Sequence, residues 1–244
     1  MTRPVLVLAD IHGNLEALKA VLSHAAGKFE EIWSLGDVAG YGPDPGPCLD
    51  ILRKMKTVMV AGNHDLAACG KLDTEDFNRE ARAAVELHRA VLSAEHQRFL
   101  AELPLIRERR SVTLSHGNPA DPVWGYVLNL FDAARVLSTA QTSLTLVGHT
   151  HLPGLWALAP SGRVVMPEAE YEAEYSYAGG LHLANPGSVG QSRDGDPSAR
   201  YMLLHPERKT LAFHSCRWKT GPTRRKMAAR GYPKSLIERM APRN

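Results

Sequence analysis

The sequence predicts an α/β protein built as a four-layer α/β/β/α sandwich, in which two mixed sheets pack together and helices cover their outer faces. Three observations favour this architecture. Short runs of strand-forming apolar residues alternate with helical patterns through the first 150 residues. A long helical pattern interrupts that alternation at residues 74–103. After residue 151, short extended runs separated by turn residues replace the helical patterns.

Five strands and two helices are expected in the first half of the chain. The strands are residues 5–8, 32–35, 58–60, 112–114 and 144–147. Residues 15–25 and 45–55 carry apolar side chains at helical spacing, and each segment follows a polar or proline-containing loop. This alternation of strand and helix predicts a mainly parallel sheet with right-handed crossovers.

Residues 74–103 are expected to form a helical insertion that could act as a lid. Ser93 is a suitable N-cap for its second helix, and Pro104 lies just beyond its end. Further strands are expected at residues 155–158, 164–166, 181–184, 201–204 and 211–213, with a hairpin around residues 206–209. The acidic segment 168–180 is expected to be a mobile loop. No linker-like stretch separates the two halves, so residues 1–244 are interpreted as a single domain.

Composition excludes several classes of protein. The chain is 44% hydrophobic and 23% charged, which is ordinary for a soluble globular protein. No segment approaches the ~18 apolar residues that a membrane span needs. The three cysteines Cys48, Cys69 and Cys216 form no CxxC pair, so neither a disulfide framework nor a thiolate metal site is indicated. We therefore expect a cytoplasmic protein without a membrane partner.

Positive charge is concentrated at the C-terminus. Residues 217–244 carry nine Lys/Arg and the single acid Glu238, a net charge of about +8 in a chain whose total is +3. This tail could contact nucleic acid, or it could be a solvated helix face. The second interpretation is favoured, because neither interleaved aromatic residues nor a known nucleic-acid motif accompanies the charges.

Polar residues of the types that bind metals follow five of the expected strands. They are Asp10 and His12 in ADIHGN, Asp37 in LGDVAGYGP, Asn63, His64 and Asp65 in AGNHD, His116 in SHGNP, and His149 and His151 in VGHTH. Functional groups of parallel α/β sheets gather at the carboxyl ends of the strands. Any one of these motifs alone would be read as a turn or a helix cap. Together they place five of the eleven histidines close to glycine at one rim, which favours a functional site.

Carboxylate, amide and imidazole groups without thiolate suit Mn²⁺, Fe²⁺ or Zn²⁺ better than Ca²⁺. Two such ions, ~3.5–4 Å apart, need a shared ligand and can activate a water molecule between them. Asp37 is central in the order of these residues and is the expected bridge.

In their order, these motifs resemble those of the calcineurin-like metallophosphoesterase superfamily, which are DxH, GD, GNH(D/E), a later His and GHxH. YGPDP, HGNP, NPGSVGQSRDG, the insertion and a C-terminal helix also resemble a bacterial and archaeal phosphodiesterase-like branch, over nearly the whole chain. The resemblance implies two divalent ions, Mn²⁺ first and Fe²⁺, Ni²⁺ or Zn²⁺ as alternatives. It implies one metal held by Asp10, His12, Asp37 and His151, and another held by Asp37, Asn63, His116 and His149.

The resemblance also implies a catalytic role for His64, which would protonate the leaving alkoxide while Asp65 orients its ring. Attack on phosphorus would then be in-line. The protein Ser/Thr phosphatases of the family carry GDxVDRG and GNHE, whereas this chain has GDVAGYGP and GNHD. A phosphodiesterase is therefore favoured over a protein phosphatase.

Other residues beside the motifs could contact substrate or simply form turns. They are Asn14, Tyr41, Asn118, Asn185, Ser188 and Arg193, while Phe77 and Asn78 could close over the site. The expected activity is hydrolysis of a small or nucleotide phosphate diester. A phosphomonoesterase or nucleotide phosphatase, and a nuclease that uses the basic tail, remain alternatives. A non-catalytic scaffold is disfavoured because His64 and every expected ligand are present. The oligomeric state is not predicted.

Overall fold

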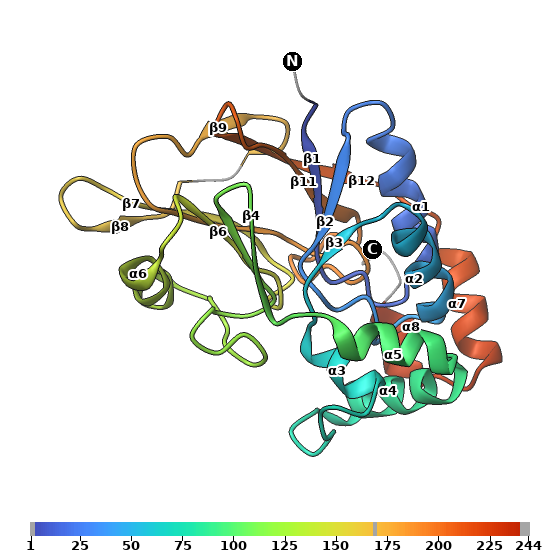
Figure 1. The fold of residues 1–244 in the computed structure, drawn as a ribbon. Coiled ribbons are helices and arrows are strands. Elements are labelled where there is room, and N and C mark those ends of the chain that lie inside the picture. Colours follow the sequence, from blue (N-terminus) through green and yellow to red (C-terminus); the bar gives the residue numbers. More distant parts are fainter. Residues whose placement is uncertain (1–2, 168–169, 240–244) are drawn as a thin grey trace.

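The computed structural model describes residues 3–167 and 170–239, in which twelve strands form two six-stranded mixed sheets (Figure 1). The first sheet has the order β3 (Val58–Met59), β2 (Glu31–Ser34), β1 (Val5–Leu8), β11 (Ala199–His205), β12 (Thr210–Cys216) and β9 (Glu174–Ser176). The second has the order β4 (Ile106–Arg109), β5 (Val112–Ser115), β6 (Leu144–Leu146), β10 (His182–Pro186), β7 (Pro153–Leu158) and β8 (Val164–Val165). The predicted sandwich of two sheets flanked by helices is confirmed.

Eight helices lie within the described residues. They are α1 (Leu15–His24), α2 (Pro45–Lys54), α3 (Asn63–Ala68), α4 (Arg79–Val91), α5 (Ala94–Glu102), α6 (Leu130–Thr139), α7 (Thr220–Ala229) and α8 (Lys234–Arg239). Helices α1, α2 and α7 lie beside the first sheet, whereas α6 lies on the opposite side of the molecule against the second (Figure 1). Helices α3, α4, α5 and α8 gather at one end of the sandwich (Figure 1).

Strand β1 connects the two parts of the core because both of its faces are apolar. Val5 and Val7 belong to the cluster between the sheets, which also contains Leu114 of the second sheet. Leu6 and Leu8 belong to the cluster shared with α1. Successive residues of a strand face opposite sides, and all four are fully buried. The continuous apolar run in the sequence is therefore that of a strand covered on both faces.

The ten strands expected from sequence are all present, with ends within three residues of the expected positions. The division of these strands between the two sheets was predicted wrongly, because the first five strands do not share one parallel sheet. Strands β1, β2 and β3 are parallel neighbours in the first sheet, while β5 and β6 are parallel neighbours in the second. The β11–β12 hairpin is confirmed by the pairing of His205 with Thr210.

Two strands and two helices, α3 and α6, escaped the sequence analysis. Strand β4 reads IRER and all four of its residues are exposed, so it has no apolar run to reveal it. Strand β9 lies inside the segment 168–180 that was expected to be a mobile loop, and it pairs with β12. That expectation is wrong for residues 174–176, while residues 168–169 lie outside the described part of the chain. Helix α6 is capped by Asn129, whose side chain accepts from two backbone N–H groups.

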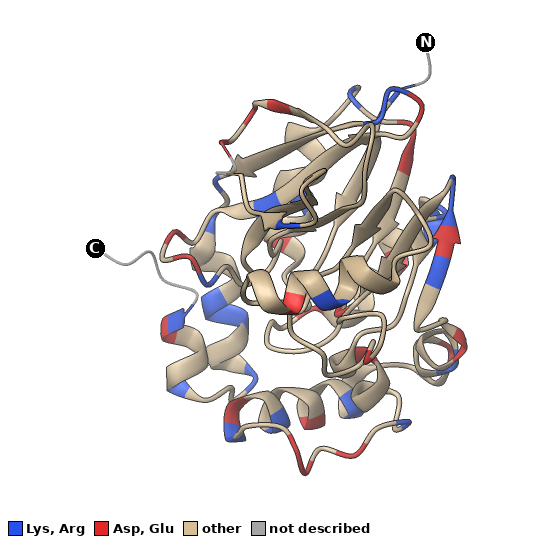
Figure 2. Cartoon of the chain, turned by 90° about the vertical axis from the view of Figure 1, so that its left-hand side faces the viewer, with Lys and Arg blue, Asp and Glu red and all other residues tan. Residues whose placement is uncertain are grey.

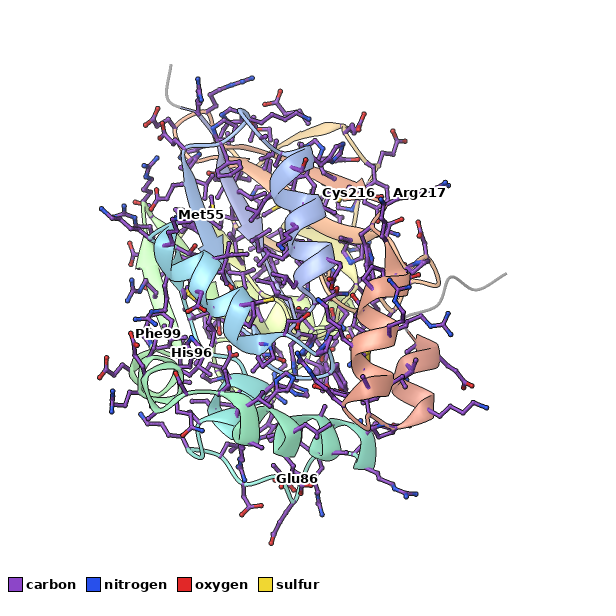
Figure 3. The ribbon with its side chains drawn as sticks, turned by 90° about the vertical axis from the view of Figure 1, so that its right-hand side faces the viewer. Met55, Glu86, His96, Phe99, Cys216 and Arg217 are labelled. Carbon is purple, nitrogen blue, oxygen red and sulfur yellow. The ribbon has the colours of Figure 1, made fainter. Side chains whose placement is uncertain are left out.

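The insertion forms two helices that dock on the body of the protein. Ser93 caps α5 as expected, and Asn78 caps α4. Helix α5 lies against α2, where the His96 imidazole is 2.9 Å from the Asp50 carboxylate. His96 and Phe99 are on the side of the molecule that Figure 3 shows.

The basic C-terminal segment folds into α7 and α8, and several of its charges are paired with the body. Lys226 lies 2.6 Å from the Glu16 carboxylate and 2.7 Å from that of Asp44. Arg230 reaches Asp44, and Arg239 reaches a carboxylate of α4. Acidic and basic residues are interspersed on the helices in Figure 2. Among the described helices, none is both long and apolar enough to cross a membrane.

Candidate metal centre

The predicted ligands stand on strained backbone at the ends of strands. Asp10, His12, Asp37, His149 and His151 all have positive φ, between 48° and 67°. This left-handed region is costly for residues with a side chain, by about 1–3 kcal/mol each, and such strain concentrates at functional sites. The strain is imposed by the loops that follow β1, β2 and β6.

Backbone and side-chain hydrogen bonds hold these loops in place. The His12 N–H donates to the Asp37 carbonyl at 2.9 Å, which ties the loop after β1 to the loop after β2. The Ser188 hydroxyl donates to the Asp10 carbonyl at 2.8 Å. The Asn185 amide donates to the Gly148 carbonyl at 2.7 Å. Asn185 and Ser188 therefore support the loops and do not line the cavity described below.

The first group of converging atoms comes from Asp10, His12 and His151. The Nε2 atoms of the two imidazoles lie 3.0 Å apart, and that of His151 is 3.4 Å from Asp10 Oδ1. The Nδ1 atom of His12 lies 2.8 Å from the Ala39 carbonyl, and that of His151 lies 2.5 Å from the Gln191 carbonyl. A carbonyl only accepts, so both Nδ1 atoms carry the proton and both Nε2 lone pairs face each other. A cation between them relieves that repulsion.

The second group comes from Asp37, Asn63, His116 and His149. His116 Nε2 lies 3.3 Å from Asp37 Oδ2, 3.2 Å from Asn63 Oδ1 and 3.0 Å from His149 Nδ1. The other nitrogen of His116 donates to the Leu35 carbonyl at 2.9 Å. Its Nε2 lone pair is therefore available to a cation and faces mostly acceptor atoms.

Asp37 belongs to both groups through the same oxygen. Its Oδ2 is 3.8 Å from His12 Nε2 and 3.3 Å from His116 Nε2. Its Oδ1 accepts from the backbone N–H of His64 at 2.9 Å, which fixes the carboxylate. Gly62 must remain a glycine here, because a Cβ on it would lie 2.0 Å from Oδ1. Asp37 Oδ2 is therefore the atom that the two groups have in common.

Burial and mutual charge interactions shift the pKa values of the acids and histidines in the centre. Burial raises the pKa of Asp10 to about 7, and the neighbouring Asp37 adds to that rise while His116 opposes it. Burial also acts to raise the pKa of Asp37, but His116 and His64 outweigh it and hold that pKa well below its usual value. Burial lowers the pKa of His116, yet the Asp37 carboxylate raises it to about 9. Asp10 Oδ1 has no hydrogen-bond partner. Divalent cations bind ionised carboxylates and neutral imidazoles, so metal binding would release the proton that Asp37 holds on His116.

His64 and Asp65 are not arranged as expected. Both oxygens of Asp65 accept from backbone, from Ala39 N–H at 2.8 Å and from Gly62 N–H at 3.2 Å. The Nδ1 atom of His64 is buried without a partner. The prediction that Asp65 orients the ring of His64 is therefore wrong, and Asp65 instead caps α3. An acid three positions into a helix after glycine was the sequence signal for this cap.

A cavity of about 480 Å³ opens above the centre and is lined by His64, His149 and His151 among others. Tyr41, Arg193, Phe77 and Asn78, which could contact substrate or close over the site, also line this cavity. The Tyr41 ring lies 4.6 Å from that of His12 and 4.7 Å from that of His64.

Two predicted contacts lie away from this cavity. The Asn14 side chain caps α1 and donates to the Gly190 carbonyl at 2.9 Å. The Asn118 oxygen accepts from the Ala120 N–H at 3.0 Å. Both are therefore accounted for by loop structure. The sequence analysis missed further lining residues, namely Trp124, Tyr126, Gln191 and Arg239. Trp124, Tyr126 and Arg239 lie in a loop or at the end of a helix without a recognisable motif, whereas Gln191 lies in the NPGSVGQSRDG motif but was not singled out there.

The whole chain resembles known metallophosphoesterases. Residues 4–209 match the model of the calcineurin-like phosphoesterase superfamily domain. The chain belongs to this superfamily. An uncharacterised protein of Methanocaldococcus jannaschii is 34% identical over 211 residues, which are 82% of each chain. The crystal structure of a metallophosphoesterase from Sphaerobacter thermophilus matches with a TM-score of 0.88 at 37% identity over 99% of each chain.

A hypothetical protein from Pyrococcus horikoshii shares the fold, with a TM-score of 0.78 at 19% identity over 98% of each chain. The superfamily is metal-dependent and acts on phosphate esters, and three groups of buried residues in this member could hold a metal ion. They are Asp10, His12 and His151; His12, Asp37 and His64; and Asp37, His116 and His149. The second group contains His64, which the sequence analysis placed outside the ligands.

Proposed function

We propose that this protein is a dinuclear metal-dependent phosphodiesterase that hydrolyses a small or nucleotide phosphate ester. The observation that carries the proposal is the pair of converging acceptor groups that share Asp37 Oδ2 at the floor of the cavity. Asp10, His12, Asp37 and His151 would hold one ion. Asp37, Asn63, His116 and His149 would hold the other, with Mn²⁺ as the preferred metal.

When bound, two divalent ions supply Lewis acidity, which neutralises phosphate charge and makes water acidic enough to attack phosphorus near neutral pH. The protein's own groups position the ester. Arg193 supplies a cation on the cavity wall for a non-bridging phosphate oxygen. Tyr41 packs against His12 and His64 and keeps their rings in place.

His64 is the group proposed to assist the leaving oxygen. Burial lowers its pKa to about 4, so the free protein holds the ring neutral at pH 7. A neutral imidazole donates a hydrogen bond from one nitrogen, and the charge of a bound phosphate raises its pKa towards the working pH. The backbone N–H of His64 is already held by Asp37, so the ring is the part that is free to act.

The basic tail does not favour a nuclease. Lys226, Arg230 and Arg239 are paired with acids of the body, which reduces the positive charge that a polynucleotide backbone would need. Free cysteines at positions 48, 69 and 216 are as expected for a reducing compartment, and we propose a cytoplasmic location.

The proposal is tested by metal content and turnover of bis-p-nitrophenyl phosphate with Mn²⁺. His64→Ala should retain both ions yet lose about 10²–10⁴-fold in kcat, because its imidazole acts on the ester rather than on folding. Asp37→Asn should lose metal itself. His205→Ala, a histidine at the end of β11 that does not line the cavity, is the matched control and should behave like wild type.

Two outcomes would contradict the proposal. One is full turnover by His64→Ala, and the other is a wild-type protein inactive with each of Mn²⁺, Fe²⁺, Ni²⁺ and Zn²⁺. Turnover of p-nitrophenyl phosphate at a kcat/KM above that of the diester would favour the phosphomonoesterase alternative.

A further inference from the structure

One wall of the cavity is aromatic. Phe77, which precedes α4, lines it together with Trp124 and Tyr126 from the loop between β5 and α6. The Tyr126 ring stacks on the ring of His149, with centroids 4.0 Å apart and planes inclined by 24°. The Phe77 ring lies edge-on to His64 at 5.0 Å and to Trp124 at 5.1 Å. A continuous series of rings therefore leads outward from the candidate metal centre.

Core packing accounts for only part of this wall. Phe77 is 7% exposed and packs in the cluster that contains Ala81 and Val85. Trp124 is only partly buried at the edge of that cluster, and Tyr126 is 43% exposed although it stacks on His149. Aromatic faces open to a polar cavity are characteristic of ligand recognition, because flat rings stack on them.

Other lining residues offer groups for the polar parts of a ligand. Arg193 lines the cavity, and its guanidinium has no ion-pair partner within residues 3–167 and 170–239. Gln191 is 5% exposed, and neither polar atom of its carboxamide has a hydrogen-bond partner. Besides the aromatic wall, the cavity lining thus presents a cation without an ion-pair partner in the described part of the chain and an unused donor–acceptor pair.

We propose that the aromatic wall binds the base of a nucleoside phosphate ester, with the base stacked on Trp124 and Tyr126 and the phosphate between Arg193 and the metal centre. This inference rests on the proposed function for the position of the phosphate. The Phe77 ring separates Trp124 from His64, so a substituent that reaches the indole needs a spacer, which ribose provides and a simple aryl ester lacks. The cavity volume suits one nucleotide.

The charged residues of the lining argue against a polynucleotide in this cavity. Asp76, Asp196 and Glu238 line it beside Arg193 and Arg239, so acids outnumber bases away from the metal centre. A chain of further phosphates would meet repulsion there. The substrate class is therefore a mononucleotide ester rather than a nucleic acid.

Equilibrium binding in the presence of Mn²⁺ tests this inference without requiring turnover. AMP and ribose 5-phosphate carry the same phosphomonoester and differ in the base. Wild type should bind AMP about tenfold or more tightly than ribose 5-phosphate, because a base stacked on an aromatic side chain contributes that much. Trp124→Leu and Tyr126→Leu, which keep apolar volume but remove the ring, should each reduce this ratio at least threefold while binding ribose 5-phosphate like wild type.

Phe131→Leu is the matched control, because Phe131 is 72% exposed and does not line the cavity. It should keep the wild-type ratio. A wild-type ratio near one, or a ratio unchanged in both Trp124→Leu and Tyr126→Leu, would overturn the inference. Phenyl phosphate that binds as tightly as AMP would overturn the assignment to a nucleobase. Each of these results is independent of whether bis-p-nitrophenyl phosphate is hydrolysed, so failure of this inference is distinguishable from failure of the proposed function.

Discussion

His88 is expected to make the protein lose stability as the pH falls below about 6.5. This residue of α4 is fully buried, and it joins the insertion to the loop after β2. Its Nδ1 accepts from the Gly40 N–H at 2.9 Å, and its Nε2 lies 2.6 Å from the Gly42 carbonyl, to which it donates. The ring is therefore a fully bonded neutral imidazole, and protonation of Nδ1 would break the bond from Gly40.

The size of this loss in the free energy of unfolding follows from the shift in the pKa of His88. Burial, the largest cause, acts together with the charges of His64 and Arg230 and against the hydrogen bond to Gly42, and the net effect lowers the pKa of His88 from 6.5 to about 4. A histidine whose pKa is lower in the folded state than in the unfolded state makes its full contribution to the free energy of unfolding when the pH is above the unfolded pKa. Its contribution falls as the pH drops from 6.5 to 4 and then stays constant. At 1.36 kcal/mol per unit, the loss is about 3 kcal/mol in total and about 2 kcal/mol by pH 5.

Urea unfolding of wild type and His88→Gln between pH 7.5 and 4.5 isolates this contribution. The glutamine amide can still donate to Gly42 but leaves the Gly40 N–H unpaired, so at pH 7 the variant should be about 1–3 kcal/mol less stable. The difference should shrink by about 2 kcal/mol at pH 5, because glutamine does not titrate. A difference that stays constant across this range would refute the reasoning, since other buried histidines affect both proteins equally.

Three further changes have expected outcomes. Gly62→Ala should fold but lose bound metal, measured by elemental analysis, because the added Cβ collides with Asp37 Oδ1; metal content equal to wild type would contradict this. Arg193→Gln should raise KM for phosphodiesters about tenfold, because the lost charge-assisted hydrogen bond is worth ~1.5–3 kcal/mol. Its thermal stability should change little, because the Arg193 side chain forms no ion pair in the described part of the chain. Chelation with EDTA should lower Tm by several degrees, since it leaves the lone pairs of His12 and His151 facing each other at 3.0 Å; an unchanged Tm would argue against a bound cation.

Much of the fold could be predicted because its signals are local. Strand β1 is a run of four apolar residues that are all buried, and Ser93 caps α5 where the sequence placed a cap. Strand β4 was missed because its exposed IRER residues carry no burial pattern. The assignment of β5 and β6 to a second sheet was missed as well. A buried parallel strand has the same composition in either sheet, and only its long-range pairing decides which one it joins.

The candidate site, like the fold, could be predicted only in part from the sequence. The metal-binding residue types at the strand ends were evident from the chain, because polar groups that interrupt apolar runs next to glycine stand out. The hydrogen-bond partner of Asp65 was not evident from the sequence, because its contact with the Ala39 N–H joins residues 26 positions apart. Trp124 and Phe77 lie 47 positions apart and carry no motif, yet they form one wall.

By itself, the sequence determined ten of the twelve described strands and the chemical types of the residues that end them. It also indicated the family that those motifs share. The tertiary structure decided which lone pairs face each other, that one oxygen of Asp37 serves both groups, and that an aromatic wall stands beside them. The physical reason is that local propensity acts over a few residues, whereas a site requires atoms brought within about 4 Å by packing between segments far apart in the chain.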